Sequence, residues 1–134
     1  MTPVVAWLWA GLVLGVSFLA TPIKFQAASL TMPVALDVGR TTFHALAKVE
    51  WLLTLVLVTA LVLGGNGGAA AWICFGGVVA IAAVQALYLI PRLDSRVEAV
   101  IAGTPMGPSH LHTAFAVIEG IKVGLLIAIG FVGG

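Results

Sequence analysis

Four apolar stretches divide the chain, and each is long enough to cross a bilayer as a helix. Such a helix needs about 20 predominantly apolar residues, and the stretches of this kind are 3–23, 44–63, 70–90 and 113–132. Between the second and third stretches lies GGNGG, a short Gly-rich turn that makes those two helices antiparallel neighbours. The pattern predicts an all-α fold, a single domain over residues 1–134 that forms an integral membrane bundle of four transmembrane helices.

The composition supports this prediction and removes several classes of function. The chain is 61% hydrophobic and 8% charged, whereas a soluble domain carries about a quarter charged residues. The net charge is +1 and no basic patch is large enough to bind nucleic acid, so we expect membrane lipid, and no nucleic acid, as a partner. With Cys74 as its single cysteine, the chain cannot form an internal disulfide or a Cys-based metal site.

The basic residues indicate an orientation. All six lie in or near two links, 24–43 and 92–112 (Lys24, Arg40, Lys48, Arg92, Arg96 and Lys122). By the positive-inside rule these links face the cytoplasm, and both termini lie on the non-cytoplasmic side of a membrane that we expect to be a bacterial inner membrane. We interpret each link either as a short helix along the membrane interface or as a solvated connector.

A weak internal repeat relates the two halves of the chain at an offset of 69 residues, without a gap. It places the first apolar stretch on the third and the second on the fourth. The matched residues are Pro22 with Pro91, Glu50 with Glu119, and Gly64-Gly65 with Gly133-Gly134. One hypothesis is a duplicated two-helix hairpin with a pseudo-two-fold axis along the membrane normal. The alternative is chance matching in a chain rich in Gly and Ala.

Small and aromatic residues suggest how the helices pack. The pairs Gly11-x3-Gly15 and Gly120-x3-Gly124 have the spacing that allows helix backbones to approach closely. Trp7, Trp9 and Trp72 lie near the outer ends of their helices, where tryptophan commonly anchors a span at the interface.

Ionisable residues inside the apolar stretches are the main candidates for ligand or ion binding. A charge near the centre of a bilayer costs ~2.5 kcal/mol or more, so it is usually paired and often functional. The candidates are Glu50, Glu119, Lys48, Lys122 and Arg40. Glu119 is three residues from Lys122 and can pair with it along one helix. Two interpretations stay open: the glutamates form a cation or proton site, or they form a structural ion pair.

Helical spacing sorts these residues by face. Arg40, His44 and Lys48 recur every four residues and share a face, while Glu50 points elsewhere on the same helix. His112, Phe115 and Glu119 share a face of the last helix. Lys48 lies about one turn inside the boundary, from which its ammonium can extend to the interface.

His44 and His112 are candidate ligands for haem or a metal ion, because neutral imidazole is the commonest metal ligand in proteins. His110 and His112 form a short H-x-H motif. The alternative is that these are interfacial histidines without a special role.

Two helix ends resemble a known class of proteins. The segments GVSFLATPIKF and ALYLIPRLDSR resemble the small four-helix bacterial membrane proteins of the DUF4149 and TMEM205-like type, and more distantly the copper-resistance D membrane domain. The tract 88–93 also resembles part of the HemJ-type protoporphyrinogen oxidase. The first resemblance implies the class of protein, the copper-resistance one implies metal handling, and the HemJ one implies a haem held by a helix histidine.

Three functions follow as hypotheses. The first is a cytoplasm-facing polar pocket for binding or transport of an ion, proton or small molecule. The second is an accessory structural subunit of a larger membrane complex, or a homo-oligomer. The third is a haem- or metal-binding redox protein. An enzyme is less favoured, because the chain has no Ser-His-Asp set, P-loop or GxGxxG motif.

Overall fold

The computed structural model describes residues 1–65, 67–104 and 110–133, and within them the chain forms helices and no strand. Four long helices are each long and apolar enough to cross a membrane. They are Thr2–Gln26 (α1 Thr2–Val13, η1 Leu14–Ala20, α2 Thr21–Ile23, η2 Lys24–Gln26), α3 Met32–Gly64, Ala69–Ile101 (α4 Ala69–Val84, η3 Gln85–Leu89, α5 Ile90–Ile101) and α6 Leu111–Val132. The predicted all-helical fold with four candidate spans is confirmed.

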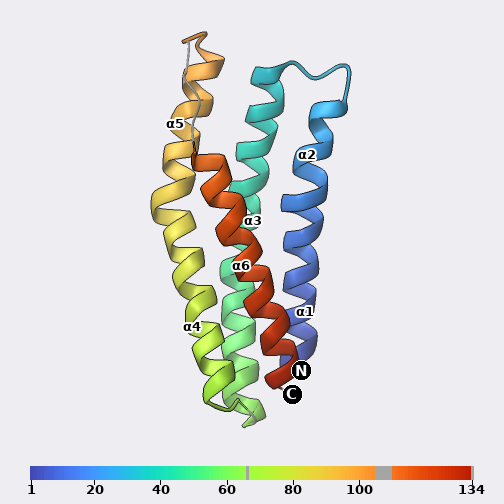
Figure 1. The fold of residues 1–134 in the computed structure, drawn as a ribbon, viewed down its shortest axis with the longest axis vertical. Coiled ribbons are helices and arrows are strands. Elements are labelled where there is room, and N and C mark those ends of the chain that lie inside the picture. Colours follow the sequence, from blue (N-terminus) through green and yellow to red (C-terminus); the bar gives the residue numbers. More distant parts are fainter. Residues whose placement is uncertain (66, 105–109, 134) are drawn as a thin grey trace.

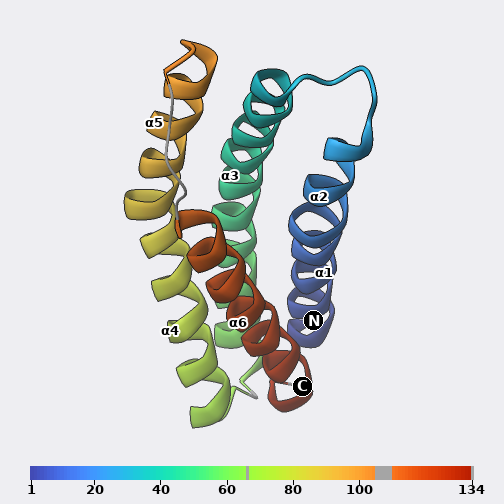
Figure 2. The ribbon, with the colours of Figure 1, turned by 45° about the horizontal axis from the view of Figure 1, so that its top comes forward.

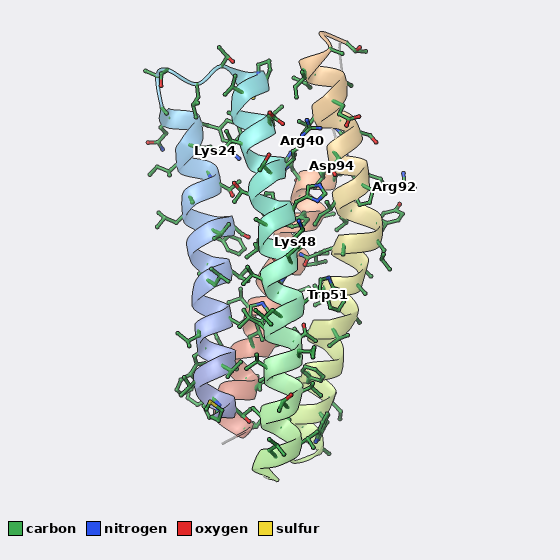
Figure 3. All side chains as sticks on the ribbon, turned by 180° about the vertical axis from the view of Figure 1, so that it is seen from behind. Lys24, Arg40, Lys48, Trp51, Arg92 and Asp94 are labelled. Atoms are coloured by element: carbon green, nitrogen blue, oxygen red, sulfur yellow. The ribbon has the colours of Figure 1, made fainter. Side chains whose placement is uncertain are left out.

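The four long helices lie side by side, and successive helices run in opposite directions (Figure 1). Both chain ends and the turn from α3 to α4 lie at one end of the bundle, which we call the terminal end. The opposite end holds Lys24, Arg40 and Arg92 and is called the basic end (Figure 3). α6 lies between α4 and α1 and begins well below the tops of α3 and α5 (Figure 2).

Among the described residues, much of each predicted link is helical and continuous with a long helix. α3 begins at Met32 after an extended Thr31, with a proline in its first turn, and continues to Gly64. α5 continues the third long helix to Ile101. At 1.5 Å per residue, a 33-residue helix is about 50 Å long, which exceeds the hydrocarbon thickness of about 30 Å. The helical parts of the links, residues 32–43 and 92–101, are therefore extensions of the long helices, and not the separate short helices or solvated connectors that were predicted.

Pro22 and Pro91 do not end their helices, because a π-helical turn precedes each of them. Proline lacks an N–H group, and its ring collides with the carbonyl four residues earlier in an α-helix. In η1 the N–H of Thr21 donates to the carbonyl of Val16, and in η3 the N–H of Ile90 donates to the carbonyl of Gln85. This wider i→i+5 bonding accommodates the proline. Both hydrogen bonds recur at the offset of 69 residues.

Close packing of α1 on α6 occurs at Gly130 rather than at the predicted glycine pairs. A Cβ added at Gly130 would overlap the Trp7 indole, and that indole also stacks edge-on against Phe131, with ring centroids 5.5 Å apart. At the predicted glycines an added Cβ would meet nothing within 4 Å (Gly11, Gly15, Gly120 and Gly124). The prediction of close approach at those pairs is therefore wrong within the chain.

Candidate functional site

Buried polar side chains are few and gathered in one place. Among the described residues, five polar or charged residues are buried: Thr2, Glu50, Gln85, Glu119 and Lys122. Thr2 lies at the start of the chain, and the other four contact one another. Together with Trp9 and Ser17, these four form what we call the Lys122 cluster.

Lys122, on α6, lies at the centre of this cluster and is 0% exposed. Its ammonium donates hydrogen bonds to Glu50 Oε2 at 2.5 Å and to Gln85 Oε1 at 2.8 Å, and it pairs with Glu119 Oε1 at 2.6 Å. The three N–H groups of the ammonium therefore meet three acceptors. A buried charge is tolerated when it is paired and hydrogen-bonded in this way.

The two glutamates have further donors. Glu119 Oε1 accepts from Gln85 Nε2 at 3.0 Å, and its Oε2 accepts from Ser17 Oγ at 2.7 Å. Glu50 Oε2 accepts from Trp9 Nε1 at 3.0 Å. The cluster therefore joins all four long helices, because its side chains come from α1, η1, α3, η3 and α6.

Local helix geometry explains how these side chains meet. Glu119 and Lys122 are three residues apart on α6, so their predicted pairing along one helix is confirmed. Ser17 lies within η1 and Gln85 begins η3. Each π-helical turn therefore contributes one polar side chain to the cluster, and such turns occur frequently at functional sites.

The formal charges of the cluster do not cancel. Two carboxylates, Glu50 and Glu119, share one ammonium, so the fully ionised cluster carries one net negative charge. An uncompensated buried charge costs several kcal/mol. The cluster can therefore lower its free energy by taking up one proton or another cation.

Two cavities connect the neighbourhood of the cluster with the basic end. The first, the Glu119 cavity, measures about 270 Å³ and is lined by Ser17, Phe18, Thr21, Pro22, Phe43, His112, Phe115, Ala116 and Glu119. The second, the basic-end cavity, measures about 370 Å³ and includes Lys24, Arg40 and Asp94 in its wall. Figure 3 shows these three residues toward the end opposite the termini. The two cavities share five lining residues: Thr21, Pro22, Phe43, His112 and Phe115.

Phe43 and Phe115 line both the basic-end cavity and the Glu119 cavity. Their rings stack edge-to-face with centroids 4.9 Å apart. Both also line a small space of about 10 Å³ beside Glu50, which is close to the volume that one water molecule requires.

The core between the cluster and the terminal end is apolar. Its twelve buried residues are Val5, Ala6, Trp9, Ala10, Val13, Leu57, Leu61, Ala71, Val78, Val123, Leu126 and Ile129. Among the described residues, no buried polar side chain other than Thr2 lies toward this end. The buried polar side chains of the described residues are therefore concentrated at the cluster and not toward the terminal end.

Three other predicted site residues lie away from the cluster. Arg40, His44 and Lys48 share a face as predicted, and that face lines an outer groove between α3 and α5. Arg40 pairs with Asp37 at 2.8 Å and with Glu98 at 3.3 Å, and His44 Nε2 lies 2.6 Å from Asp94 Oδ2. Lys48 is exposed in this groove, on the side of α3 that does not bear Glu50. Arg40 alone among the three also lines the basic-end cavity.

The two candidate metal ligands line different hollows. His112 shares the Glu119 cavity with Phe115 and Glu119, which confirms their predicted common face. His44 lines the outer groove instead. Within the part of the chain that the structure describes, no three His, Cys, Asp or Glu side chains form a group that could hold a metal ion.

Two members of the cluster, Trp9 and Ser17, were not predicted from the sequence. Trp9, predicted to be an interfacial anchor, is 0% exposed and donates to Glu50. Ser17 was not predicted as a site residue, although a hydroxyl in an apolar span commonly hydrogen-bonds to another helix. Gln85, a polar residue of the third apolar stretch, bonds to both Glu119 and Lys122.

Comparisons with protein-family models, with curated proteins and with solved structures found no match for this chain. The resemblance to the DUF4149 and TMEM205-like proteins stays a prediction, as do the haem or metal cofactor and the homo-oligomer or complex.

Proposed function

We propose that this chain is an integral membrane protein that binds a proton at Glu50 and Glu119, as the central site of a small binding or transport protein. The observation that carries the proposal is a pair of buried carboxylates that share one buried ammonium. One of the two, Glu119, also lines a cavity that adjoins the basic-end cavity. An ionisable group within a membrane span commonly marks an ion or proton pathway.

Insertion into a membrane is supported by the outward-facing side chains. Large apolar residues are exposed along the sides of the bundle, including Leu8, Leu52, Ile73, Leu87 and Val117. A soluble monomer rarely exposes contiguous apolar patches larger than a few hundred Å², whereas lipid covers such a surface without cost. With the basic end in the cytoplasm, both termini lie on the non-cytoplasmic side.

This orientation is tested with reporter fusions at the C-terminus in a bacterial host. Alkaline phosphatase, which folds outside the cytoplasm, should be active at this position, and green fluorescent protein exported through the same route should be dark. The reverse pattern would overturn the proposed orientation.

Duplication of a two-helix hairpin is part of the proposal. Two observations support it beyond the sequence: the π-helical turns occur at the offset of 69 residues, and the matched glutamates meet at a single lysine nitrogen. Two residues related by a pseudo-two-fold axis meet in this way when they lie close to the axis. Lys122 matches Leu53 at the same offset, so one cation serves both acids.

The proton site is tested by infrared difference spectroscopy of the protein in lipid during a pH step. A carboxylic acid in an apolar site gives a C=O stretching band that is separate from the bands of ionised carboxylates. We expect this band in the wild type and its loss or shift in Glu50→Gln and Glu119→Gln. Asp94→Asn is the matched control, since it removes a carboxylate of the outer groove and should leave the band unchanged. A wild-type spectrum without the band, or a band insensitive to both Gln variants, would contradict the proposal.

A second candidate function is structural. It is favoured by the complete hydrogen bonding of the Lys122 ammonium and by the number of helices that the cluster joins. On this alternative the Gln variants lose stability together, and no carboxyl group changes its protonation during the pH step.

A further inference from the structure

The basic-end cavity lies where the bundle has three full helices and the beginning of a fourth. α6 starts at Leu111, below the ends of α3 and α5 (Figure 2). The wall therefore comes from α2 and η2, from α3, from α5, and from the first turns of α6. Its volume of about 370 Å³ falls within the range of about 300–1,000 Å³ for small-molecule sites. At about 30 Å³ for a water-sized atom, it accommodates about a dozen heavy atoms.

The wall is mostly apolar and partly aromatic. Its apolar residues are Pro22, Phe25, Leu36, Phe43, Ile90, Leu93, Val97 and Phe115. The polar and charged residues are Thr21, Lys24, Arg40, Asp94 and His112. Apolar walls with a few placed polar groups are typical of small-molecule binding sites.

The charged groups of the wall differ in their partners. Arg40 pairs with Asp37 and Glu98, and Asp94 pairs with His44. Lys24 pairs with no carboxylate within 4.0 Å among the described residues, and its described interaction is with the Phe25 ring, 5.2 Å from Nζ to the ring centroid. Its ammonium is therefore the wall charge that remains available to a ligand.

The position of the Lys24 ammonium depends on a glycine. Nζ lies against Gly39 of α3, where an added Cβ would overlap it. Gly39 also lines the cavity, so its missing side chain lets the ammonium lie across the gap between the first long helix and α3. His112, on the first turn of α6, provides a second nitrogen donor in the same wall.

From this arrangement we infer that the basic-end cavity binds a small amphipathic carboxylate of about a dozen heavy atoms. Its carboxylate pairs with Lys24 and accepts a hydrogen bond from His112. Its apolar body packs against Phe25, Phe43 and Phe115, where an aromatic ring gains edge-to-face contacts. The volume excludes a two-chain lipid, and Asp94 in the wall disfavours a dianion. Neither Glu50 nor Glu119 lines this cavity, so the inference goes beyond the proposed proton site.

The test uses tritiated phenylbutyrate, which has a carboxylate, a phenyl ring and a suitable size. Binding to the purified protein in lipid nanodiscs is measured by scintillation proximity, and unlabelled phenylbutyrate and its neutral isostere phenylbutyramide serve as competitors. We expect the acid to compete about tenfold better than the amide, since a charge-assisted pair of about 1.4 kcal/mol is worth that factor. Lys24→Met should reduce the preference to about twofold or less, while Lys24→Arg should retain it. Lys48→Met, which removes an exposed lysine of the outer groove, is the matched control and should leave binding unchanged.

A second variant tests the place of binding. Leu36→Trp adds volume inside the basic-end cavity and should weaken binding of the acid and of the amide alike. Glu119→Gln should leave phenylbutyrate binding intact, so a failed proton site and a failed ligand site give different results. The inference is overturned if the wild type does not bind phenylbutyrate, if acid and amide compete equally, if Lys24→Met keeps the preference, or if Leu36→Trp binds normally.

Discussion

Replacing Lys122 by methionine is the most direct probe of the central cluster, because it removes the shared cation and keeps a side chain of similar length. Lys122 is 0% exposed, and the side chains of its partners Glu50 and Glu119 are 8% and 1% exposed. Breaking a buried pair by removing one partner typically costs about 3–5 kcal/mol, since the remaining charge stays buried without compensation. Here two carboxylates lose their common partner, so we expect a loss at the upper end of that range.

The loss is measured as the free energy of unfolding in mixed micelles, by titration with a denaturing detergent while tryptophan fluorescence is recorded. Trp9 reports on the cluster directly because its indole N–H donates to Glu50. Two matched variants make the measurement interpretable. Lys48→Met removes an exposed lysine and should change stability by no more than about 0.5 kcal/mol. The triple variant Glu50→Gln, Glu119→Gln, Lys122→Met removes every charge of the cluster and should recover most of the loss.

Two results would refute the reasoning. If Lys122→Met costs no more than Lys48→Met, the lysine does not compensate the two carboxylates. If the triple variant is as unstable as Lys122→Met, the loss comes from packing around the side chain and not from an uncompensated charge.

Two further predictions concern single side chains, each with a control in the same chain. Ser17→Ala removes a donor to a buried carboxylate and should cost about 1.5–3 kcal/mol, whereas Ser95→Ala, at an exposed hydroxyl, should change the unfolding free energy by less than about 0.5 kcal/mol. Equal effects of the two would contradict the Ser17 contact. Gly130→Ala introduces a Cβ into the space of the Trp7 indole and should cost about 1–3 kcal/mol. As the control, the Cβ of Gly120→Ala meets nothing within 4 Å and should stabilise the helix by up to about 1 kcal/mol. A Gly130→Ala variant that keeps the wild-type unfolding free energy would refute the close contact between α1 and α6.

Much of the fold follows from the sequence because apolar spans leave few alternatives. A backbone in hydrocarbon must satisfy its own hydrogen bonds, so long apolar stretches form helices. The local pairing of Glu119 with Lys122 and the common face of His112 and Glu119 follow from helical spacing alone. The positions of the basic residues along the chain also predict that most of them gather at one end of the bundle.

The continuation of two helices past their prolines was not predictable from composition. Pro22 and Pro91 are typical stop signals, yet both helices continue because π-helical turns accommodate the missing N–H groups. Whether a chain widens one turn or ends its helix depends on the packing available to the residues that follow.

Only the tertiary structure decided which polar groups meet. Spacing shows which residues of one helix share a face, but the rotation of that helix against its neighbours is set by how all the side chains pack. That rotation turned Trp9 and Ser17 inward to the glutamates, turned Lys48 outward to the groove beside α5, and aimed Lys122 at Glu50 on another helix. The sequence therefore determined the helices and their charged end. The packing of four helices against one another determined the buried cluster, because it depends on contacts between residues that lie far apart along the chain.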